Sequence, residues 1–290
     1  MERKVGKHII TTTNEDVIWF PKSKITKGDV LNYYEKIAPI MVPHMYGHPV
    51  TMLRYVDGIQ GEGFYHKDAP TYFPKWIKRC NVAKKEDGTT SYVLCNEPAT
   101  LVYLAQQACL VPHLWLSKCD KLNSPDLLIF DLDPAKQPFS FICDVALRLK
   151  EILEANNLVP FIKLTGSRGL HVTVPIKRLY TFDFVRDFAK EVGQILVEDD
   201  PKNLTMEIRK EKRKGRLFID INRNGFTATA VAPYAIRAYE KAPVAAPLLW
   251  DEVKKKGLTA QKYNISNIFK RLSRIGDPWH DIQKHATKLP

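Results

Sequence analysis

The sequence predicts an α+β fold with mixed or antiparallel sheets, flanked by helices, around a split βαβ unit of the ferredoxin or RRM type. Two observations lead to this prediction. Between residues 127 and 221, apolar periodicity runs in the order strand, helix, hairpin, helix, strand. This order disfavours a Rossmann alternation, and the chain also contains no Gly-x-Gly-x-x-Gly motif.

The first part of the chain shows fewer regular elements. Residues 1–20 are predicted to form a basic tail and a short strand or turn that ends at Pro21. Asp29 is the expected cap of a helix that Pro39 ends, since apolar residues follow at helical spacing. A strand over 51–56 and a helix over 98–108, with proline in its first turn, come next.

The second part holds the predicted core. A buried strand over 127–133 precedes a helix over 139–157. Two strands, over 159–164 and 170–175, are joined by a glycine-containing turn. Thr181 is expected to cap an amphipathic helix that reaches Val197, and a strand over 217–221 completes the unit.

Charge and cysteine usage narrow the class of protein. The net charge of +12 in 290 residues indicates a polyanionic partner, most often nucleic acid. The cysteines are scattered and odd in number, so neither a disulfide framework nor a zinc site is expected. The expected location is a reduced intracellular compartment. No segment resembles a signal peptide or a membrane span, which predicts a soluble, cytoplasmic protein without a membrane partner.

Three aspartates stand in apolar strands. Alternation places Asp131 and Asp133 on one face of their strand, where two close carboxylates favour a bound divalent cation. Asp220 occupies a second apolar strand, and it can lie beside them in a sheet. Three such carboxylates predict two magnesium or manganese ions for nucleotidyl transfer. The alternative is a strand that ends in a solvated acidic turn.

Two segments offer positive charge. The turn Thr165-Gly166-Ser167-Arg168-Gly169-Leu170-His171 has the hydroxyls, glycines and arginine that bind phosphates. The run from Arg209 to Arg216 has six basic residues in eight and leads into the Asp220 strand. Lys22, Lys24 and Lys27 form a further basic cluster. The turn is a candidate triphosphate site, whereas the basic run and the lysine cluster can contact phosphates of a nucleic-acid backbone. The alternative for the basic run is a solvated loop.

The adjacent aromatics Phe64 and Tyr65 precede His66 and Lys67. Both cannot point into a core from an extended segment, so one should be exposed. This arrangement suits a platform on which a base stacks, or else a loop anchored by one ring.

In combination, these motifs resemble the polymerase domain of bacterial and archaeal ligase D, a branch of the archaeo-eukaryotic primase superfamily that acts in non-homologous end joining. The resemblance rests on segments that extend along nearly the whole chain, in this order: Ile25-Thr26-Lys27-Gly28-Asp29, Gly63-Phe64-Tyr65-His66-Lys67, His113-Leu114-Trp115-Leu116-Ser117, Phe130-Asp131-Leu132-Asp133-Pro134, Gly166-Ser167-Arg168-Gly169-Leu170-His171, Asp220 and Tyr234-Ala235-Ile236-Arg237-Ala238.

The resemblance implies roles for individual residues. Asp131, Asp133 and Asp220 would be the catalytic, metal-binding aspartates. The implied nucleotide-binding residues are Thr165, Ser167, Arg168, Gly169, His171, His113 and Arg237. Lys27 would bind the 5′-phosphate of a downstream strand, and Phe64 and Tyr65 would stack on the template. The other candidate DNA contacts are Lys22, Lys24, Arg54, Lys67 and Arg213.

Several positions depart from the family pattern. Arg168 stands where lysine is frequent, Thr165 where serine is frequent, and Leu114 where the pattern has proline. Val17 replaces a lysine, which predicts a weaker or differently built 5′-phosphate pocket. The family's Asp-Trp-Ser-Gln-Asn becomes Asp220-Ile221-Asn222-Arg223-Asn224, so Arg223 adds a positive charge beside the third carboxylate.

The resulting functional prediction is a template-directed polymerase that extends primers at gaps and double-strand-break ends. It would use NTP or dNTP substrates, favour ribonucleotides, and employ manganese or magnesium. The alternatives are a primase that starts chains without a primer and a non-catalytic module that binds DNA ends. Residues 1–290 are expected to form one primase-polymerase domain, with an N-terminal lobe over 1–110 and the core over 111–290. A stand-alone chain would work with a separate ligase and a Ku-like end-binding protein at the prokaryotic nucleoid.

Overall fold

A computed structural model describes residues 1–84 and 87–290. The described chain forms two compact units whose segments interleave in the sequence. The first unit contains residues 1–120, 229–245 and 263–269, and the second contains 121–228, 246–262 and 270–290. The boundary expected near residue 110 falls at the start of strand β9, which belongs to the first unit.

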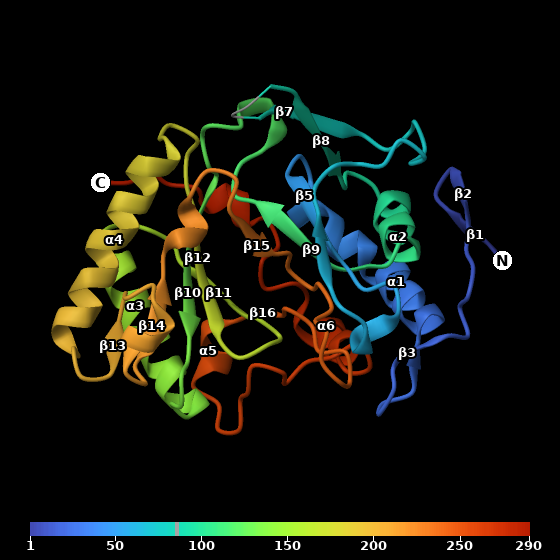
Figure 1. The fold of residues 1–290 in the computed structure, drawn as a ribbon. Helices are drawn as coiled ribbons and strands as arrows, with labels where there is room; N and C mark the ends of the chain where they lie inside the picture. The colour runs from blue at the N-terminus through green and yellow to red at the C-terminus, as the bar shows by residue number, and fades with distance from the viewer. Residues whose placement is uncertain (85–86) are drawn as a thin grey trace. The chain divides into compact units, whose positions relative to one another are not determined.

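The first unit is built on a sheet in the order β15-β9-β5-β8-β7, and β6 pairs with β5. Two short hairpins, β1-β2 and β3-β4, complete its strands. Helices α1 and α2 pack on each other beside this sheet (Figure 1). The elements are β1 (Glu2–Val5), β2 (His8–Thr11), β3 (Ile18–Phe20), β4 (Ile25–Thr26), α1 (Lys27–Met45), β5 (Pro49–Arg54), β6 (Phe64–His66), β7 (Arg79–Ala83), β8 (Thr89–Leu94), α2 (Pro98–Gln106), β9 (Cys109–Trp115) and β15 (Thr229–Val231).

Helix α1 corrects two predictions. Thr26 is its N-cap, and Asp29 completes a capping box as the third helical residue. The helix also passes through Pro39 and Pro43 to Met45, so the prediction that Pro39 ends it was wrong. Proline removes a backbone donor from a helix, but the last turns bury Met41 and Met45 completely, and this burial outweighs the loss.

Residues 2–11, which were predicted to belong to a basic tail, form regular strands. β1 and β2 form a regular antiparallel hairpin, in which Arg3 pairs with Ile10. Arg3 also forms ion pairs with Glu15 and Glu35, which fasten the hairpin to the segment that follows and to α1. Strands β7, β8 and β9 were likewise not predicted.

A disulfide links Cys80 to Cys119, with Cα atoms 5.8 Å apart, and this contradicts the expectation that the cysteines stay reduced. Cys80 lies in β7, and Cys119 lies shortly after β9, so the bond joins segments 39 residues apart. The described free cysteines are Cys95, Cys109 and Cys143, all buried.

The second unit is organised around a six-stranded sheet in the order β13-β14-β10-β12-β11-β16 (Figure 1). Its elements are β10 (Leu127–Asp133), α3 (Phe139–Ala155), β11 (Phe161–Leu164), β12 (Leu170–Pro175), α4 (Phe182–Asp199), β13 (Leu204–Thr205), β14 (Leu217–Asp220), β16 (Pro247–Leu248) and α5 (Trp250–Val253). Helix α6 (Ile268–Ile275) crosses from the first unit into the second.

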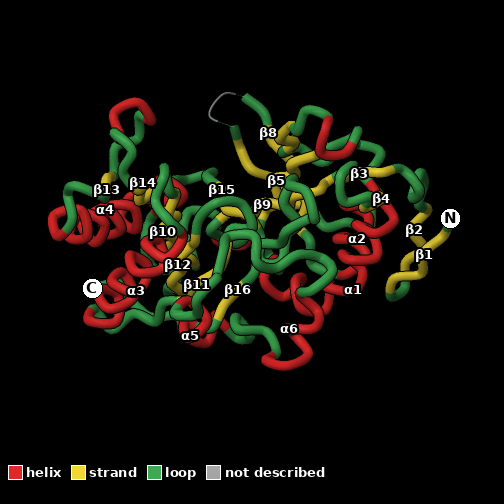
Figure 2. The backbone as a smooth tube through the Cα atoms, turned by 90° about the horizontal axis from the view of Figure 1, so that it is seen from below, coloured by secondary structure: helices red, strands yellow, loops and turns green. Residues whose placement is uncertain are grey.

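The predicted split βαβ unit is confirmed. Strands β10, β11, β12 and β14, with helices α3 and α4 between them, have the spatial order β14-β10-β12-β11, and each adjacent pair is antiparallel. α3 and α4 contact each other and lie on the same side of the sheet (Figure 2). Thr181 caps α4 as predicted, through its hydroxyl and the Phe184 amide.

The helix-facing side of this sheet forms the core of the second unit. Leu128, Phe130 and Leu132 of β10 are fully buried, as are Val145 and Leu149 of α3. The opposite alternation of β10 therefore turns Asp131 and Asp133 away from these helices. Among the described residues, no helix is long and apolar enough to cross a membrane.

Candidate active site

One row of polar residues crosses four strands of the second unit. Asp131 of β10 is in direct register with Asp220 of β14 on one side and with His171 of β12 on the other. His171 in turn pairs with Lys163 of β11. Directly opposed residues of antiparallel strands point to the same face. The sheet register therefore gathers two carboxylates, an imidazole and an ammonium group in one line.

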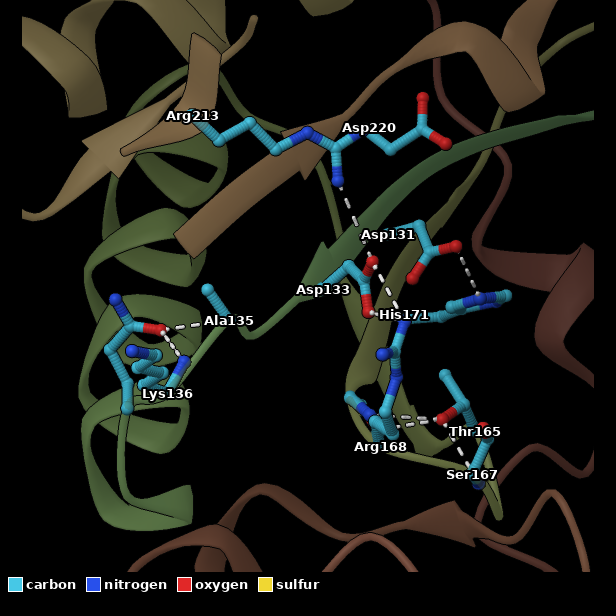
Figure 3. A network of polar contacts seen from close by, with 12 residues as sticks. Asp131, Asp133, Ala135, Lys136, Thr165, Ser167, Arg168, His171, Arg213 and Asp220 are labelled. Atoms are coloured by element: carbon cyan, nitrogen blue, oxygen red, sulfur yellow. Dashed lines mark hydrogen bonds and ion pairs between the residues drawn. The ribbon is translucent and has the colours of Figure 1, made fainter. Parts of the chain in front are cut away.

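Asp131 and His171 form the centre of this row. The His171 Nε2 atom lies 3.4 Å from Asp131 Oδ2 (Figure 3). His171 is only 3% exposed, and burial lowers its pKa to about 4, with the charge of Lys163 acting in the same direction and Asp131 opposing both. Its Nδ1 atom has no hydrogen-bond partner among the described residues, so the neutral ring is expected to carry its proton on Nε2 and donate it to Asp131.

Asp131 stays ionised in this setting. Burial alone would raise its pKa, but the His171 ring and the Arg223 guanidinium outweigh burial and hold the pKa at about 2. Asp133 behaves differently, because burial and the neighbouring carboxylates raise its pKa although Arg168 and Arg213 lower it. The pKa values of these two aspartates, which share one strand face, are therefore shifted in opposite directions.

Arg168 reaches Asp133 from the turn between β11 and β12. Its Nη2 atom lies 3.0 Å from Asp133 Oδ1 and 3.3 Å from Oδ2 (Figure 3). The arginine side chain is 61% exposed, so most of its guanidinium remains available to another anion. The turn that sequence analysis assigned to phosphate binding is thus directly connected to the carboxylates.

The shape of this turn is set by Thr165 and Gly169. The Thr165 hydroxyl donates to the Gly169 carbonyl and accepts from the Ser167 and Gly169 amides. These bonds make Thr165 an organiser of the turn, whereas its predicted contact with a nucleotide stays a prediction. A Cβ atom at Gly169 would lie 2.0 Å from the Leu132 carbonyl oxygen, so only glycine lets the turn approach β10 this closely.

A groove of about 510 Å³ adjoins the turn in the second unit. Arg168 and Lys136 bring positive charge to it, and Ser167 and Gln261 line it with polar groups. Gln261 donates to the Ser167 carbonyl, which fixes one wall. The dimensions and charge of the groove suit an extended anion such as a triphosphate.

Arg213 makes contacts within the protein, whereas the lysines of its basic run are exposed. Arg213 lies 3.6 Å above the Phe218 ring centroid and donates to the Glu207 and Ile208 carbonyls. Its Nη1 atom is 3.8 Å from Asp133 Oδ2. The side chain therefore ties the basic loop to the carboxylate strands, while Lys210, Lys212 and Lys214 are exposed around it. Its predicted role in DNA binding remains untested.

The donor set fits hard divalent cations. Carboxylate oxygens are the ligands that magnesium and manganese prefer, and the sheet register brings Asp131 and Asp220 opposite each other with Asp133 two residues away. Among the residues that the structure describes, however, no three potential ligands already form a closed metal cluster. Arginine side chains form ion pairs with all three carboxylates: Arg223 with Asp131 and Asp220, and Arg168 with Asp133.

The predicted aromatic platform belongs to the first unit. Phe64 and Tyr65 of β6 are 45% and 59% exposed, so neither ring is tucked into the core as the loop-anchor alternative required. Arg54 lies 5.7 Å from the Phe64 ring centroid, bonds to His66 Nδ1 and donates to the Gln107 carbonyl. Arg54 thus contacts both Phe64 and His66 of β6 and helps to hold the strand in place. Lys67, which follows β6, is exposed.

Two predicted nucleotide-binding residues also lie in the first unit. His113 of β9 is 8% exposed, and the Tyr65 ring approaches it edge-on at 5.5 Å. Arg237 is half-buried, and its amide donates to the Pro243 carbonyl. Their contact with a nucleotide stays a prediction.

The three lysines of the predicted basic cluster, Lys22, Lys24 and Lys27, differ in solvent exposure. Lys22 and Lys24 are exposed, whereas Lys27 at the start of α1 is only 7% exposed and lies 5.9 Å from the Trp19 ring centroid. Burial lowers the pKa of Lys27, and the charge of Glu15 partly offsets this. A phosphate partner would supply the countercharge that a largely buried ammonium group requires.

Sequence reasoning missed two supports of the site. Asn224 is completely buried and bonds both the amide and the carbonyl of Ile129, which anchors the turn after β14 to β10. Lys163 is 1% exposed beside His171. Lys163 could have been found from the sequence, because it stands inside an apolar strand, where burying a charged side chain is costly unless it has a partner.

The sheet order, the paired carboxylates and the basic turn define a primase-polymerase of the archaeo-eukaryotic primase fold. The family described as "LigD, primase-polymerase domain" matches residues 26–279, and the chain belongs to this family.

Individual relatives agree. The chain is 32% identical over 271 residues to the multifunctional non-homologous end joining protein LigD of Mycolicibacterium smegmatis, covering 92% of this chain and 35% of the relative. It is 28% identical over 280 residues to the bifunctional non-homologous end joining protein LigD of Bacillus subtilis, covering 96% of this chain and 45% of the relative. The chain thus spans less than half the length of either protein.

A solved structure shares the fold over nearly the whole chain. The polymerase domain of Mycobacterium tuberculosis ligase D, in complex with DNA, superposes with a TM-score of 0.88 at 29% identity. The match covers 96% of this chain and 99% of the mycobacterial domain. The predicted fold class and family are therefore confirmed.

Proposed function

We propose that this chain is a template-directed nucleotidyltransferase that extends primers at gaps and double-strand-break ends in non-homologous end joining. The observation that carries this proposal is the direct register of Asp131 with Asp220, beside a basic turn and an anion-sized groove. A solved relative with the same fold is a polymerase domain bound to DNA, which supports a DNA substrate here.

Asp131, Asp133 and Asp220 would hold magnesium or manganese ions. Bound cations would favour deprotonation of a primer 3′-hydroxyl and neutralise charge on the triphosphate. The protein's own residues would orient the reactants: Arg168 and Ser167, which line the groove, would bind the β- and γ-phosphates. The 3′-oxygen attacks the α-phosphorus, the bond to the β-phosphate oxygen breaks, and pyrophosphate leaves.

The first unit would bind the nucleic acid. Exposed Phe64 and Tyr65 offer ring faces on which template bases can stack. Lys22 and Lys24 offer exposed charges, and Lys27 offers a sheltered one suited to a terminal 5′-phosphate. The net charge of +12 supports attraction to DNA, with affinity that falls as salt rises.

Partners and location follow from the family's role in end joining. We propose that the polymerase acts on broken ends at the nucleoid in the cytoplasm, together with a Ku-like end-binding protein and a ligase activity. Ribonucleotides and manganese are the expected preferences.

Primer extension on a gapped duplex tests the 5′-phosphate part of this proposal. The downstream strand carries either a 5′-phosphate or a 5′-hydroxyl, and extension should be faster with the phosphate. Lys27→Ala, and the doubly substituted Lys22→Ala/Lys24→Ala protein, should reduce that advantage. Lys190→Ala, which changes an exposed lysine of α4, is the matched control.

Other outcomes point to the rival functions. Synthesis on an unprimed template, without any need for a 3′-hydroxyl, would identify a primase that starts chains. Binding of DNA ends without synthesis under any metal or nucleotide condition would identify a non-catalytic end-binding module.

A further inference from the structure

Arg223 occupies a rigidly held turn directly beside the carboxylates. It is the central residue of a 3₁₀ turn, Asn222–Asn224, that follows β14. Asn222 donates to Asp220 Oδ1 through both its amide and its side chain, each at 2.8 Å. Asn224 is bonded to both backbone groups of Ile129. The turn is thus fastened to both carboxylate-bearing strands.

These anchors aim the Arg223 side chain at two carboxylates at once. Its Nε atom lies 3.4 Å from Asp131 Oδ2 and 3.7 Å from Asp220 Oδ2. Because Asn222 satisfies Asp220 Oδ1, the oxygen that faces Arg223 is the one left for an external cation. A cation that bridges the two strands would therefore compete with Arg223 for Asp220 Oδ2. On Asp131, the oxygen that Arg223 approaches, Oδ2, also lies 3.4 Å from His171 Nε2.

The positive charge of Arg223 reduces the electrostatic repulsion between Asp131 and Asp220 when no metal is bound. Two ionised carboxylates opposed on neighbouring strands repel each other, and this repulsion destabilises the sheet at that point. The guanidinium, which is 42% exposed, reduces the repulsion without closing the site to solvent. A divalent cation that binds Asp220 Oδ2 must then compete with this internal partner.

We propose that Arg223 is a built-in counter-ion of the carboxylate site: it holds Asp131 and Asp220 together in the metal-free protein, and it makes divalent-cation binding weak until nucleotide phosphates accept its charge. This inference rests on the proposed function, because it assumes that the three aspartates bind metal. A guanidinium released by the cation has a triphosphate as its natural new partner. Metal and nucleotide should therefore strengthen each other's binding by the same factor.

The test measures manganese binding directly, without any catalytic turnover. Free Mn²⁺ is titrated by electron paramagnetic resonance against the wild type and Arg223→Gln, with and without a non-hydrolysable nucleoside triphosphate. Glutamine keeps the polar character of the position and removes its charge. Arg148→Gln, which removes an equal charge at the Asp199 pair between α3 and α4, is the matched control.

In the absence of nucleotide, Arg223→Gln should bind Mn²⁺ about fivefold to tenfold more tightly than the wild type. The nucleotide should tighten Mn²⁺ binding in the wild type by a larger factor than in this variant. Arg223→Lys, which keeps the charge but lacks the planar guanidinium, should fall between them. In EDTA, Arg223→Gln should also melt below the wild type, and Mn²⁺ should abolish the difference.

Equal or weaker Mn²⁺ binding by Arg223→Gln would overturn the inference and leave Arg223 without a role in metal exchange. That result, combined with templated synthesis by the wild type, would leave the proposed polymerase function intact. If the wild type bound no Mn²⁺ even with nucleotide, the metal assignment itself would be wrong, and the inference would fall with it.

Discussion

Asp131 and Asp220 are direct cross-strand partners in the antiparallel register of β10 and β14. Their side chains therefore share one face of the sheet although they are 89 positions apart in the chain. His171 extends the same row on the far side of Asp131. The geometry of the candidate site is thus a property of the sheet register, and a slip of one residue in a strand would send its carboxylate to the helix-covered face.

Gly169→Ala should destabilise the second unit by about 1–3 kcal/mol, because the added methyl group would overlap the Leu132 carbonyl oxygen. Urea unfolding measures this free energy. Ser167→Ala is the control, since it changes a half-buried residue of the same turn without adding volume. Equal stability of Gly169→Ala and the wild type would show that the turn does not pack against β10 as described.

Tyr65→Ala should weaken binding of a DNA template overhang by about 1–3 kcal/mol, the range for loss of one base–aromatic stack. Fluorescence anisotropy with a labelled gapped duplex measures the affinity. Tyr72→Ala removes another exposed tyrosine of the same unit and should bind normally. Equal losses in both variants would mean that the Phe64–Tyr65 platform makes no specific contact.

His171 should make the metal-free protein sensitive to acid. Its pKa in the folded state, about 4, lies below the ordinary value near 6.5. The contribution to stability is therefore complete above pH 6.5 and is lost as the pH falls through 4. Unfolding of the wild type and His171→Asn in EDTA should show a stability difference that shrinks by at most about 1.4 kcal/mol per pH unit between pH 6 and 4. Parallel pH profiles would contradict this assignment.

The Cys80–Cys119 disulfide should be detectable by thiol titration. The denatured, unreduced protein should expose the three thiols of Cys95, Cys109 and Cys143, and reduction should expose all five cysteines. Loss of the bond in Cys80→Ser should lower the unfolding free energy by roughly 2–4 kcal/mol. Cys143→Ser leaves the bond in place and serves as control. Five reactive thiols before reduction would rule out the disulfide.

The sequence carried enough information to predict the split βαβ unit within the second unit. Periodicity located β10, α3, β11, β12, α4 and β14 in the correct order, because α3 and α4 each have one buried face and the strands are short apolar runs. The alternation of β10 also separated Asp131 and Asp133 from the buried Leu128, Phe130 and Leu132. These features depend on local pattern, which a single sequence displays.

Features that depend on tertiary contact were not predictable in the same way. Helix α1 continues past Pro39 because its last turns are buried, and the burial of a helix face is not visible from the proline itself. The Cys80–Cys119 pairing depends on the proximity of two segments, which cysteine spacing does not reveal. The contact of Arg223 with Asp131 depends on the turn that Asn222 and Asn224 anchor.

The most direct test of the central claim is incorporation of a single templated nucleotide into a gapped duplex. The wild type, Asp220→Ala and the control Asp144→Ala, which changes an exposed aspartate of α3, are compared in manganese with a labelled primer. The wild type and Asp144→Ala should add the nucleotide complementary to the template. Asp220→Ala should be at least about a hundredfold slower while binding the duplex normally. Near-normal extension by Asp220→Ala would contradict catalysis at these carboxylates.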